Sequence, residues 1–388
     1  MASELKVNTI TEATSGSGIT FAKDIIPATP LSHRNMIING AMNVYQRGSL
    51  SITQSNDGGY SLDRFKFAMN SQVAQLAGTM SQHSMSSAEL NTTGFAKALK
   101  FETTTPESNW DSDELAYIQQ IIEAQHLQHL QYGTASAKSV TLSFWVKSSV
   151  TGTFAVGIYK QDTTARLINK TITISDTNWN KYTLTFPGDT DSGATIANDT
   201  GAGLYILWHL GAGSTYNDGA NTSWENYTNA GWAGGHAQNG IVTTNGATWY
   251  LTGVQLELGT VATPFEHRSY GEELLRCQRY FQKVENTASG TEYFGLMQAY
   301  GTGAVYGIVK DYVTTMRVEP HTVTSGGTFG AYQAGSSNAG STTGISGLAA
   351  SPISWLSTGF SGFSGLTAGN ASVIFWHANA YLTADAEL

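Results

Sequence analysis

The chain has 388 residues, of which only 13% are charged, with a formal net charge of −9 and 42 glycines. This composition is typical of β-rich, turn-rich proteins, and because the sequence has no cluster of Lys and Arg, it argues against nucleic acid as a partner. The single cysteine excludes an intrachain disulfide framework, no apolar run approaches the ~20 residues that span a bilayer, and 40% hydrophobic residues are enough to build a core.

The first segment, residues 1–30, is expected to be a chain-pairing segment followed by a linker. It has short apolar strings around the turn-forming sequence TSGSG, which offer too little surface to form a core alone. The segment is therefore expected to pair with another chain or with its own copies in an oligomer. The apolar residues concerned are Leu5, Val7, Ile10, Ile19 and Phe21. Residues 1–10 lack the basic and apolar regions of a signal peptide, which favours assembly in a cytoplasm.

Residues 31–268 are expected to form one antiparallel β-domain. Apolar residues alternate with polar ones along residues 140–146, 154–158, 182–186 and 204–210, a period of two that predicts strands. Several such strands with turn signals between them predict a two-sheet sandwich. Residues 114–132 are ambiguous, because their β-branched content fits a strand and their apolar spacing also fits a helix.

The stretch from residue 252 to residue 281 switches its hydrophobic period. Val254, Leu256 and Leu258 alternate with Gln255 and Glu257, which predicts a half-buried strand. Gly and Pro then interrupt the pattern, and apolar residues recur at helical spacing, with glutamates where the helix dipole favours negative charge. We expect a connecting helix within residues 269–285, at 272–284, with its single thiol buried and inert.

The remaining residues, 286–388, are expected to form a smaller β-domain. Its predicted strands are residues 293–300, 304–309 and 373–382. Between them lies a Gly/Ser/Thr-rich tract, residues 324–347, which we interpret as loop surface at an exposed tip. No repeat period is evident, which counts against a long β-helix. The fold class predicted for the whole chain is all-β, an antiparallel sandwich followed by one short helix and a smaller C-terminal β-domain.

An ordered set of short motifs runs through residues 2–281. The motifs are ASELKVNTI, NMIINGAMNVYQRG, YSLDRFKF, TLSFWVKSS, WNKYTLTFPG, GVQLELG, ATPFEHRSYGEEL and CQRYF. In this order they resemble a module of tail-fibre and other virion proteins of tailed phages, many of them marine. The resemblance implies a carbohydrate-binding-module-like sandwich of the jelly-roll or galactose-binding type and a homotrimer. It also implies that residues 1–30 attach to other tail or baseplate proteins, and it favours a strand and then a short helix near residues 124–130.

Aromatic and amide-rich residues between positions 208 and 249 are the first candidate site. Sugars present flat apolar faces ringed by hydroxyls, and aromatic side chains flanked by Asp, Asn and Gln suit them. The candidate residues are Tyr216, Trp224, Tyr227 and Trp232. The alternative is that these large side chains only anchor a long loop by packing.

A second aromatic group lies in the C-terminal unit, where glycines separate the aromatic residues along SWLSTGFSGFSG. Exposed aromatic residues at a distal tip are typical of a receptor-binding surface. The candidates are Trp355, Phe360, Phe363 and Trp376. The alternative, favoured for two of the four, is that they fill the core of a trimer.

Metal and catalytic sites find little support in the sequence, and no cofactor is expected. The pairs Asp189/Asp191 and Asn217/Asp218 match no EF-hand pattern. The pair His126/His129 lacks a third zinc ligand and is interpreted as surface. No catalytic motif appears, so we expect a protein that is not an enzyme. The carboxylates that folding could still bring together are Asp111, Asp113 and Glu114.

The sequence and the resemblance together favour a receptor-binding subunit of a phage tail fibre. It would sit on the virion and attach it to host surface polysaccharide or lipopolysaccharide, without inserting into a membrane. A structural virion component without a glycan-binding role, such as a head fibre, a capsid decoration or a tail adaptor, is the alternative. A polysaccharide-degrading enzyme ranks third.

Overall fold

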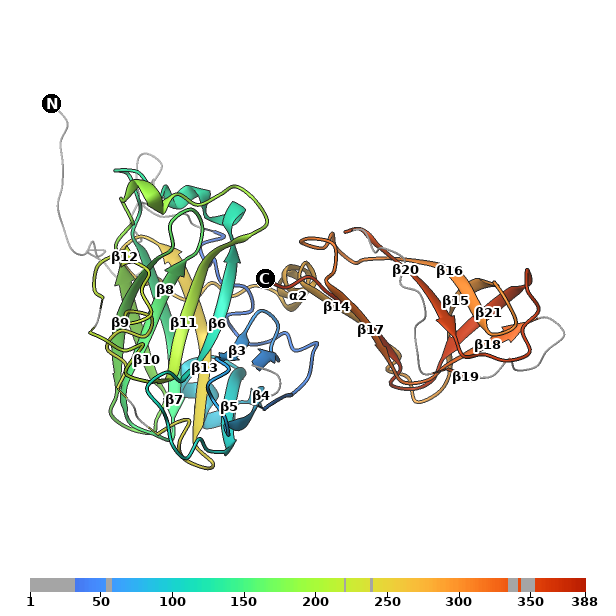
Figure 1. Cartoon of the computed structure of the whole chain (residues 1–388), viewed down its shortest axis with the longest axis horizontal. Helices are drawn as coiled ribbons and strands as arrows, with labels where there is room; N and C mark the ends of the chain where they lie inside the picture. The colour runs from blue at the N-terminus through green and yellow to red at the C-terminus, as the bar shows by residue number, and fades with distance from the viewer. Residues whose placement is uncertain (1–31, 54–57, 220, 238–239, 334–340, 343–352) are drawn as a thin grey trace, which may run out of the picture.

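The chain forms two β-rich lobes, a larger sandwich and a smaller C-terminal domain, with helix α2 between them (Figure 1). The computed structural model describes residues 32–53, 58–219, 221–237, 240–333, 341–342 and 353–388. The predicted attachment residues Leu5, Val7, Ile10, Ile19 and Phe21 lie outside this part of the chain. No helix within the described residues is long and apolar enough to cross a membrane.

The sandwich consists of two antiparallel sheets, one of six strands and one of seven. The six-stranded sheet has the order β1 (Leu50–Ile52), β4 (Ala77–Ser84), β5 (Lys97–Thr105), β13 (Thr248–Leu258), β7 (Val140–Ser148) and β10 (Asn180–Phe186). The seven-stranded sheet has the order β12 (Glu225–Asn226), β9 (Arg166–Ile174), β8 (Gly152–Lys160), β11 (Ala202–Ala212), β6 (Leu115–Glu123), β3 (Lys66–Met69) and β2 (Gly58–Tyr60). Helix α1 (Ser87–Thr93) joins β4 to β5, and a short helix η3 (Ser192–Ala194) precedes β11.

The core lies between these two sheets and confirms the predicted alternation. Phe144, Phe154, Trp208 and Trp249 come from both sheets and are fully buried in one hydrophobic cluster. The prediction for residues 114–132 is also confirmed, since β6 runs directly into the 3-10 helix η2 (Ala124–Leu130). The sandwich thus has the all-β architecture that the spacing of apolar residues predicts.

Strand β13 differs from its prediction, because both of its faces are buried. Gln255 and Glu257 are 0% and 1% exposed, like the apolar residues with which they alternate. The chain turns back after β13, and Thr263 N donates to Glu257 Oε1 at 2.8 Å while Glu266 N donates to Gln255 Oε1 at 2.8 Å. Buried polar groups need such partners, so this turn is what allows polar side chains in a covered strand.

The C-terminal domain contains two further antiparallel sheets. The three-stranded sheet has the order β14 (Phe281–Glu285), β22 (Tyr381–Asp385) and β17 (Thr322–Gly326). The six-stranded sheet has the order β19 (Ser341–Thr342), β18 (Phe329–Gln333), β21 (Ala371–Trp376), β15 (Glu292–Ala299), β16 (Ala304–Asp311) and β20 (Trp355–Ser361).

Two predictions for this domain are corrected by these strands. The strand expected over residues 373–382 is two strands, β21 and β22, separated by a turn that sends them into different sheets. The tract at residues 324–347, interpreted as loop surface, contains most of β17, all of β18 and all of β19. Its residues 334–340 and 343–347 lie outside the described part of the chain.

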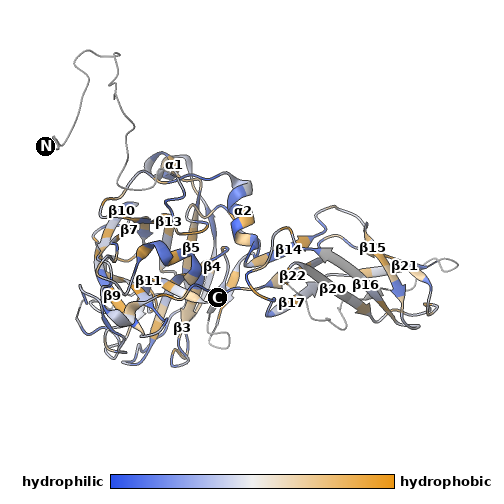
Figure 2. Cartoon of the chain, turned by 90° about the horizontal axis from the view of Figure 1, so that it is seen from above, coloured by the Kyte–Doolittle hydropathy of each residue, from blue (hydrophilic) through white to orange (hydrophobic). Residues whose placement is uncertain are grey.

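Helix α2 (Tyr270–Gln278) is shorter than the predicted helix at residues 272–284. Ser269 caps its N-terminus, because the side chain of Ser269 accepts from Glu272 N. The helix is short because residues 281–285 instead pair with β22 as strand β14. Cys277 is fully buried on this helix, and burial raises the pKa of its thiol well above the usual value, which fits an inert side chain. Figure 2 shows α2 between the sandwich and the C-terminal domain.

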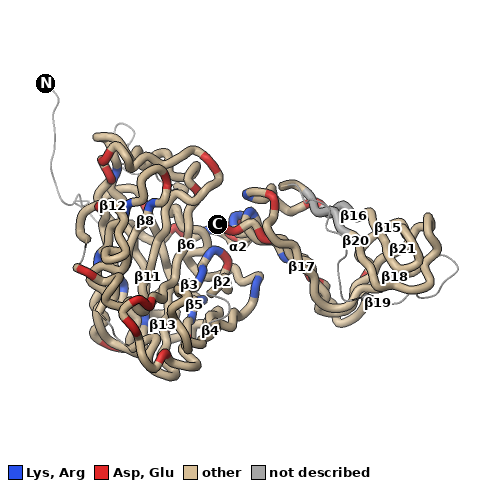
Figure 3. The backbone as a smooth tube through the Cα atoms, viewed as in Figure 1, with Lys and Arg blue, Asp and Glu red and all other residues tan. Residues whose placement is uncertain are grey.

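Charged residues of both signs gather at the junction of the two lobes (Figure 3). Arg64 lies 3.4 Å from the ring centroid of Tyr280 and forms a buried ion pair with Glu387. Arg47 stacks in the same way on Phe281, at 3.7 Å, and its Nη1 lies 2.6 Å from Asp385 Oδ2. Arginine combines stacking with fork-shaped hydrogen bonding, so these contacts hold the first and last strands of the C-terminal domain against the sandwich.

Candidate ligand-binding face

Three tyrosines lie together on the outer face of the seven-stranded sheet. Residues in a strand alternate between its two faces, so Leu204, Ile206 and Trp208 in the core place Tyr205 on the opposite side of β11. Tyr159 on β8 is directly opposite Tyr205 in the antiparallel register, with ring centroids 5.3 Å apart. The third tyrosine, on β6, is directly opposite His209, which lies four residues after Tyr205 on β11 and therefore on the same face. The three residues are Tyr117, Tyr159 and Tyr205, all partly exposed.

The segment between β11 and β13 adds two more rings to this group. Trp232 lies 4.9 Å from Tyr159 and 5.9 Å from Tyr117, measured between ring centroids. Tyr227 lies 5.5 Å from both Trp232 and Tyr159. All four pairs are edge-on, an arrangement that aromatic rings favour. We call Tyr117, Tyr159, Tyr205, Tyr227 and Trp232 the aromatic face.

The segment that carries Tyr227 and Trp232 is fastened to the sheet by one buried arginine. Arg166 on β9 donates to Asp189 from Nε at 2.5 Å and from Nη2 at 3.1 Å. The same guanidinium donates to Asn226 Oδ1 at 2.8 Å and to the Trp224 carbonyl at 3.3 Å. A bidentate, charge-assisted pair of this kind has a fixed geometry. It therefore fixes the position of residues next to the aromatic face.

The aromatic face is uncharged at neutral pH. Burial raises the pKa of Tyr117 to about 12 and raises the pKa values of the other three tyrosines above their usual value. Two of the hydroxyls donate to side-chain amides, Tyr205 to Gln161 Oε1 at 2.5 Å and Tyr227 to Asn229 Oδ1 at 2.6 Å. Each amide keeps an NH2 group that can donate to a ligand. The face thus offers ring surfaces edged by neutral hydrogen-bonding groups.

The structure unites three of the four candidates from the first aromatic group. Tyr216 and Trp232 belong to one small cluster around Leu115 and Ala233, and Tyr227 contacts Trp232. Trp224 lies apart from them, since its indole donates to the Pro187 carbonyl at 2.7 Å and its ring packs edge-on against Tyr132. Trp224 therefore packs against the sandwich and does not join the aromatic face.

The second aromatic group is not an exposed surface. Phe360, Phe363 and Trp376 are 0%, 6% and 7% exposed and belong to the core of the C-terminal domain, whereas the side chain of Trp355 lies outside the described part of the structure. Glycines between aromatic residues can free the backbone to display them at a surface. Gly359 instead permits close packing, because a Cβ there would lie 2.5 Å from a ring atom of Tyr306.

Sequence reasoning missed Tyr117, Tyr159 and Tyr205. The same alternation that identifies the core places Tyr159 and Tyr205 on the outer face, so a search for aromatic residues at outward positions finds them. What the sequence lacks is the strand order, which brings β8, β11 and β6 together. Tyr117 lies in the stretch whose helix or strand character was open, so its direction could not be assigned.

The carboxylates considered for catalysis or metal binding have structural partners. Burial raises the pKa of Glu114, and this side chain accepts from Asp111 N at 2.7 Å in the turn before β6, while Asp113 is exposed. Asp189 is held by Arg166, and Asp191 caps the short helix η3. In the part of the chain that is described, no three His, Cys, Asp or Glu side chains gather where they could hold a metal ion.

Comparisons with known proteins give structural likenesses at low sequence identity. No protein-family profile and no curated protein sequence matches the chain. A chain described as the enzymatically active domain of tailspike protein 4 of bacteriophage CBA120 is 12% identical, with a TM-score of 0.30, over 58% of this chain and 21% of that one. This chain thus spans about a fifth of the tailspike chain.

Two carbohydrate-binding modules are similar over most of their own length. A family 4 module is 13% identical over 57% of this chain and 97% of that chain, with a TM-score of 0.29. A family 11 module from Clostridium thermocellum, solved with a mixed-linked tetrasaccharide, is 12% identical over 56% and 98%, with a TM-score of 0.27. At these TM-scores the likenesses carry no argument about ligands, and the sandwich architecture follows from the strand order of the chain itself.

Proposed function

We propose that the chain binds a neutral glycan through the aromatic face and does so without catalysis. The observation that carries the proposal is the set of partly exposed rings from three neighbouring strands and one anchored segment. Sugar rings have apolar CH faces that pack on aromatic rings, and their hydroxyls pair with amides such as those of Gln161 and Asn229. An uncharged face with these groups at its edge fits that chemistry.

The rigidity of the aromatic face supports the same proposal. Tyr117, Tyr159 and Tyr205 project from sheet strands, and the segment with Trp232 is tied down by the Asn169 side chain, whose Nδ2 donates to the Gly231 carbonyl at 2.6 Å. A site that is already ordered loses little conformational entropy on binding.

A few stacking contacts still give weak affinity for one site, and several copies on one particle would raise the avidity by orders of magnitude.

We further propose that the chain is a tail-fibre subunit of a tailed phage, with host surface polysaccharide or lipopolysaccharide as its ligand. The support is the ordered set of motifs in residues 2–281 and its resemblance to such virion proteins. In this proposal residues 1–30 attach a homotrimer to other tail or baseplate proteins. Mass spectrometry of purified virions and light scattering of the purified protein test these parts, which fail if the chain is absent from particles or is monomeric.

The glycan-binding proposal is tested with a double variant, Tyr159→Ala/Trp232→Ala, in affinity electrophoresis through gels that contain bacterial surface polysaccharides. If a polysaccharide retards the wild type, we expect the double variant to bind it at least about tenfold more weakly, because two stacking surfaces are lost. Tyr300→Ala is the matched control, since it removes a tyrosine that is 80% exposed on the other lobe.

The outcomes separate the alternatives. Retardation that survives in the double variant but is lost in Tyr300→Ala would move the glycan site to the C-terminal domain. If a correctly folded wild type is retarded by none of a broad set of polysaccharides, the glycan-binding proposal is wrong. Circular dichroism and the milder change Trp232→Phe show whether any loss results from misfolding of the segment.

A further inference from the structure

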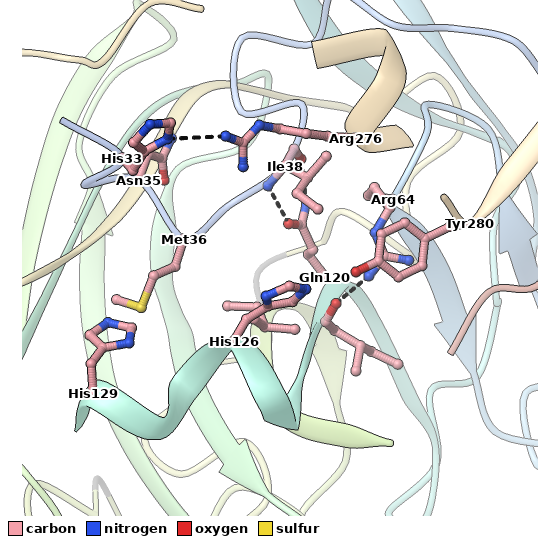
Figure 4. Close-up of a pocket in the computed structure, with 12 residues that line it drawn as sticks. His33, Asn35, Met36, Ile38, Arg64, Gln120, His126, His129, Arg276 and Tyr280 are labelled. Carbon is pink, nitrogen blue, oxygen red and sulfur yellow. Dashed lines mark hydrogen bonds between the residues drawn. The ribbon is translucent and has the colours of Figure 1, made fainter. Parts of the chain in front are cut away.

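A second candidate site lies where three segments of the sandwich meet at its junction with the C-terminal domain. A pocket of about 170 Å³ is enclosed by residues 33–38, by the end of β6 with helix η2, and by helix α2 with Tyr280. Figure 4 shows His33 and Arg276 on one side of this space and His126 and His129, both on η2, on the other. Met36 lies between the two sides.

The lining of this pocket differs from the rest of the chain in its charge. Two arginines and three histidines contribute to it, and no aspartate or glutamate does, although the chain carries a formal net charge of −9. Arg64 is already engaged, because it pairs with Glu387 and stacks on Tyr280. Arg276 is also paired, with Glu272, but only through Nη2, so its other guanidinium nitrogens remain for a ligand.

The guanidinium of Arg276 is held in place but not satisfied. Its Nη2 donates to Glu272 Oε1 at 3.0 Å and to His33 Nδ1 at 3.2 Å. An arginine can only donate, so Nδ1 of His33 is the acceptor and its ring proton is on Nε2. Nε of Arg276 is buried and has no hydrogen-bond partner within the described residues. A buried donor without a partner is destabilising, and an acceptor atom from a ligand would satisfy it.

The histidines opposite Arg276 also carry ring N–H groups, although Nε2 of His126 is within ion-pair distance of Glu123. Nε2 of His126 is 3.7 Å from Glu123 Oε1, beyond hydrogen-bond distance. The carboxylate of Glu123 already accepts from Arg279 at 2.7 and 2.9 Å and from the Tyr280 hydroxyl at 2.5 Å. His129 has no hydrogen-bond partner among the described residues, and burial lowers its pKa, so it is a neutral donor at pH 7.

We propose that this pocket binds a small oxyanion, either free or as the acidic group of a sugar. Nε–H of Arg276 supplies a charged donor, and ring N–H groups of His126 and His129 supply donors from the opposite side. Oxyanions such as carboxylates form strong, charge-assisted hydrogen bonds with a guanidinium, and ring N–H groups of histidines can add neutral ones. An anion would be matched by the guanidinium nitrogens of Arg276 that Glu272 leaves free, and no aspartate or glutamate lines the pocket itself.

The proposal is tested by isothermal titration calorimetry of the full chain with inorganic sulfate, D-glucuronate and D-glucose. Both anions are expected to bind and glucose is not, and a preference for glucuronate over sulfate would identify an acidic sugar as the source of the anion. Arg276→Gln should weaken anion binding about tenfold or more, since it removes a charged hydrogen bond. The double variant His126→Gln/His129→Gln should weaken it by a smaller factor.

Matched controls keep the result interpretable. Lys181→Gln removes one positive charge from an exposed position on β10 and should leave anion affinity unchanged. The double variant of the aromatic face, Tyr159→Ala/Trp232→Ala, should also bind the anions normally, so the two sites can fail independently. Anion binding that is absent in the wild type, or equally strong in Arg276→Gln and in Lys181→Gln, would overturn the proposal.

Discussion

The buried pair of Arg166 and Asp189 makes the sharpest prediction about how the aromatic face is held. Both side chains are almost inaccessible, at 8% and 2% exposure, and they share two hydrogen bonds. Arg166→Met would leave the carboxylate buried without its cation, a change that costs about 3–5 kcal/mol in buried pairs. It would also remove the bonds to Asn226 Oδ1 and to the Trp224 carbonyl.

A double variant that removes both charges separates the cost of the stranded carboxylate from the loss of the bonds to Asn226 and Trp224. In Arg166→Met/Asp189→Leu no charge is stranded, so we expect most of the lost stability to return. Polysaccharide affinity should stay low in both variants, because the bonds from Arg166 to Asn226 and Trp224 are missing from each. Urea unfolding followed by tryptophan fluorescence measures the stability, since Trp208 and Trp249 report on the sandwich core. The reasoning is refuted if the single variant loses less than about 1 kcal/mol, or if the double variant is no more stable than the single one.

Three further predictions concern stability. Burial raises the pKa of Glu123, but the ion pairs with His126 and Arg279 and the hydrogen bond from Tyr280 outweigh this and hold the pKa well below its usual range. The contribution of Glu123 to stability is therefore present above about pH 4.3 and lost below it. Urea midpoints between pH 7 and pH 3.5 should therefore fall less in Glu123→Gln than in the wild type. Gly253 has φ +60°, and a Cβ there would lie 2.5 Å from a phenylalanine ring. Gly246 has φ +75°, but a Cβ there would have no atom within 4 Å. Gly253→Ala should therefore lower the melting temperature more than Gly246→Ala. Trp376→Ala should destabilise the C-terminal domain by about 3–5 kcal/mol, whereas Tyr300→Ala should change unfolding by less than about 0.5 kcal/mol; equal effects would contradict the burial described.

The sequence predicts the sandwich core well because burial there depends only on local alternation. Phe144, Phe154 and Trp208 each lie in a run with period two, and their direction follows without knowledge of their partners. The aromatic face is different, since Tyr117, Tyr159 and Tyr205 come from strands separated by up to 88 positions in sequence numbering and meet only through the strand order. Periodicity alone contains no information about which strands are neighbours.

The C-terminal domain shows a second limit of sequence reasoning. Glycine next to an aromatic residue has two physical uses, to free the backbone or to make room for another side chain. Gly359 next to Phe360 serves the second use, because the ring of Tyr306 occupies the space a Cβ would need. The sequence does not distinguish these uses, so it leaves the surface and a core as alternatives for Phe360, Phe363 and Trp376, and it does not single out Tyr293 and Tyr300, which are 76% and 80% exposed.

Strands β14 and β22 pair with each other beside the sandwich, so the C-terminal domain is entered and left at the same place. The six-stranded sheet is therefore inserted between two paired strands. Its sequence can change without altering the contacts that hold β14 and β22 against the sandwich. The same arrangement makes docking depend on residues far apart in the sequence. Arg47 and Arg64 find Asp385 and Glu387 only after the intervening strands have been synthesised and folded. A chain interrupted within this domain would therefore lack the carboxylate partners of both arginines at the junction.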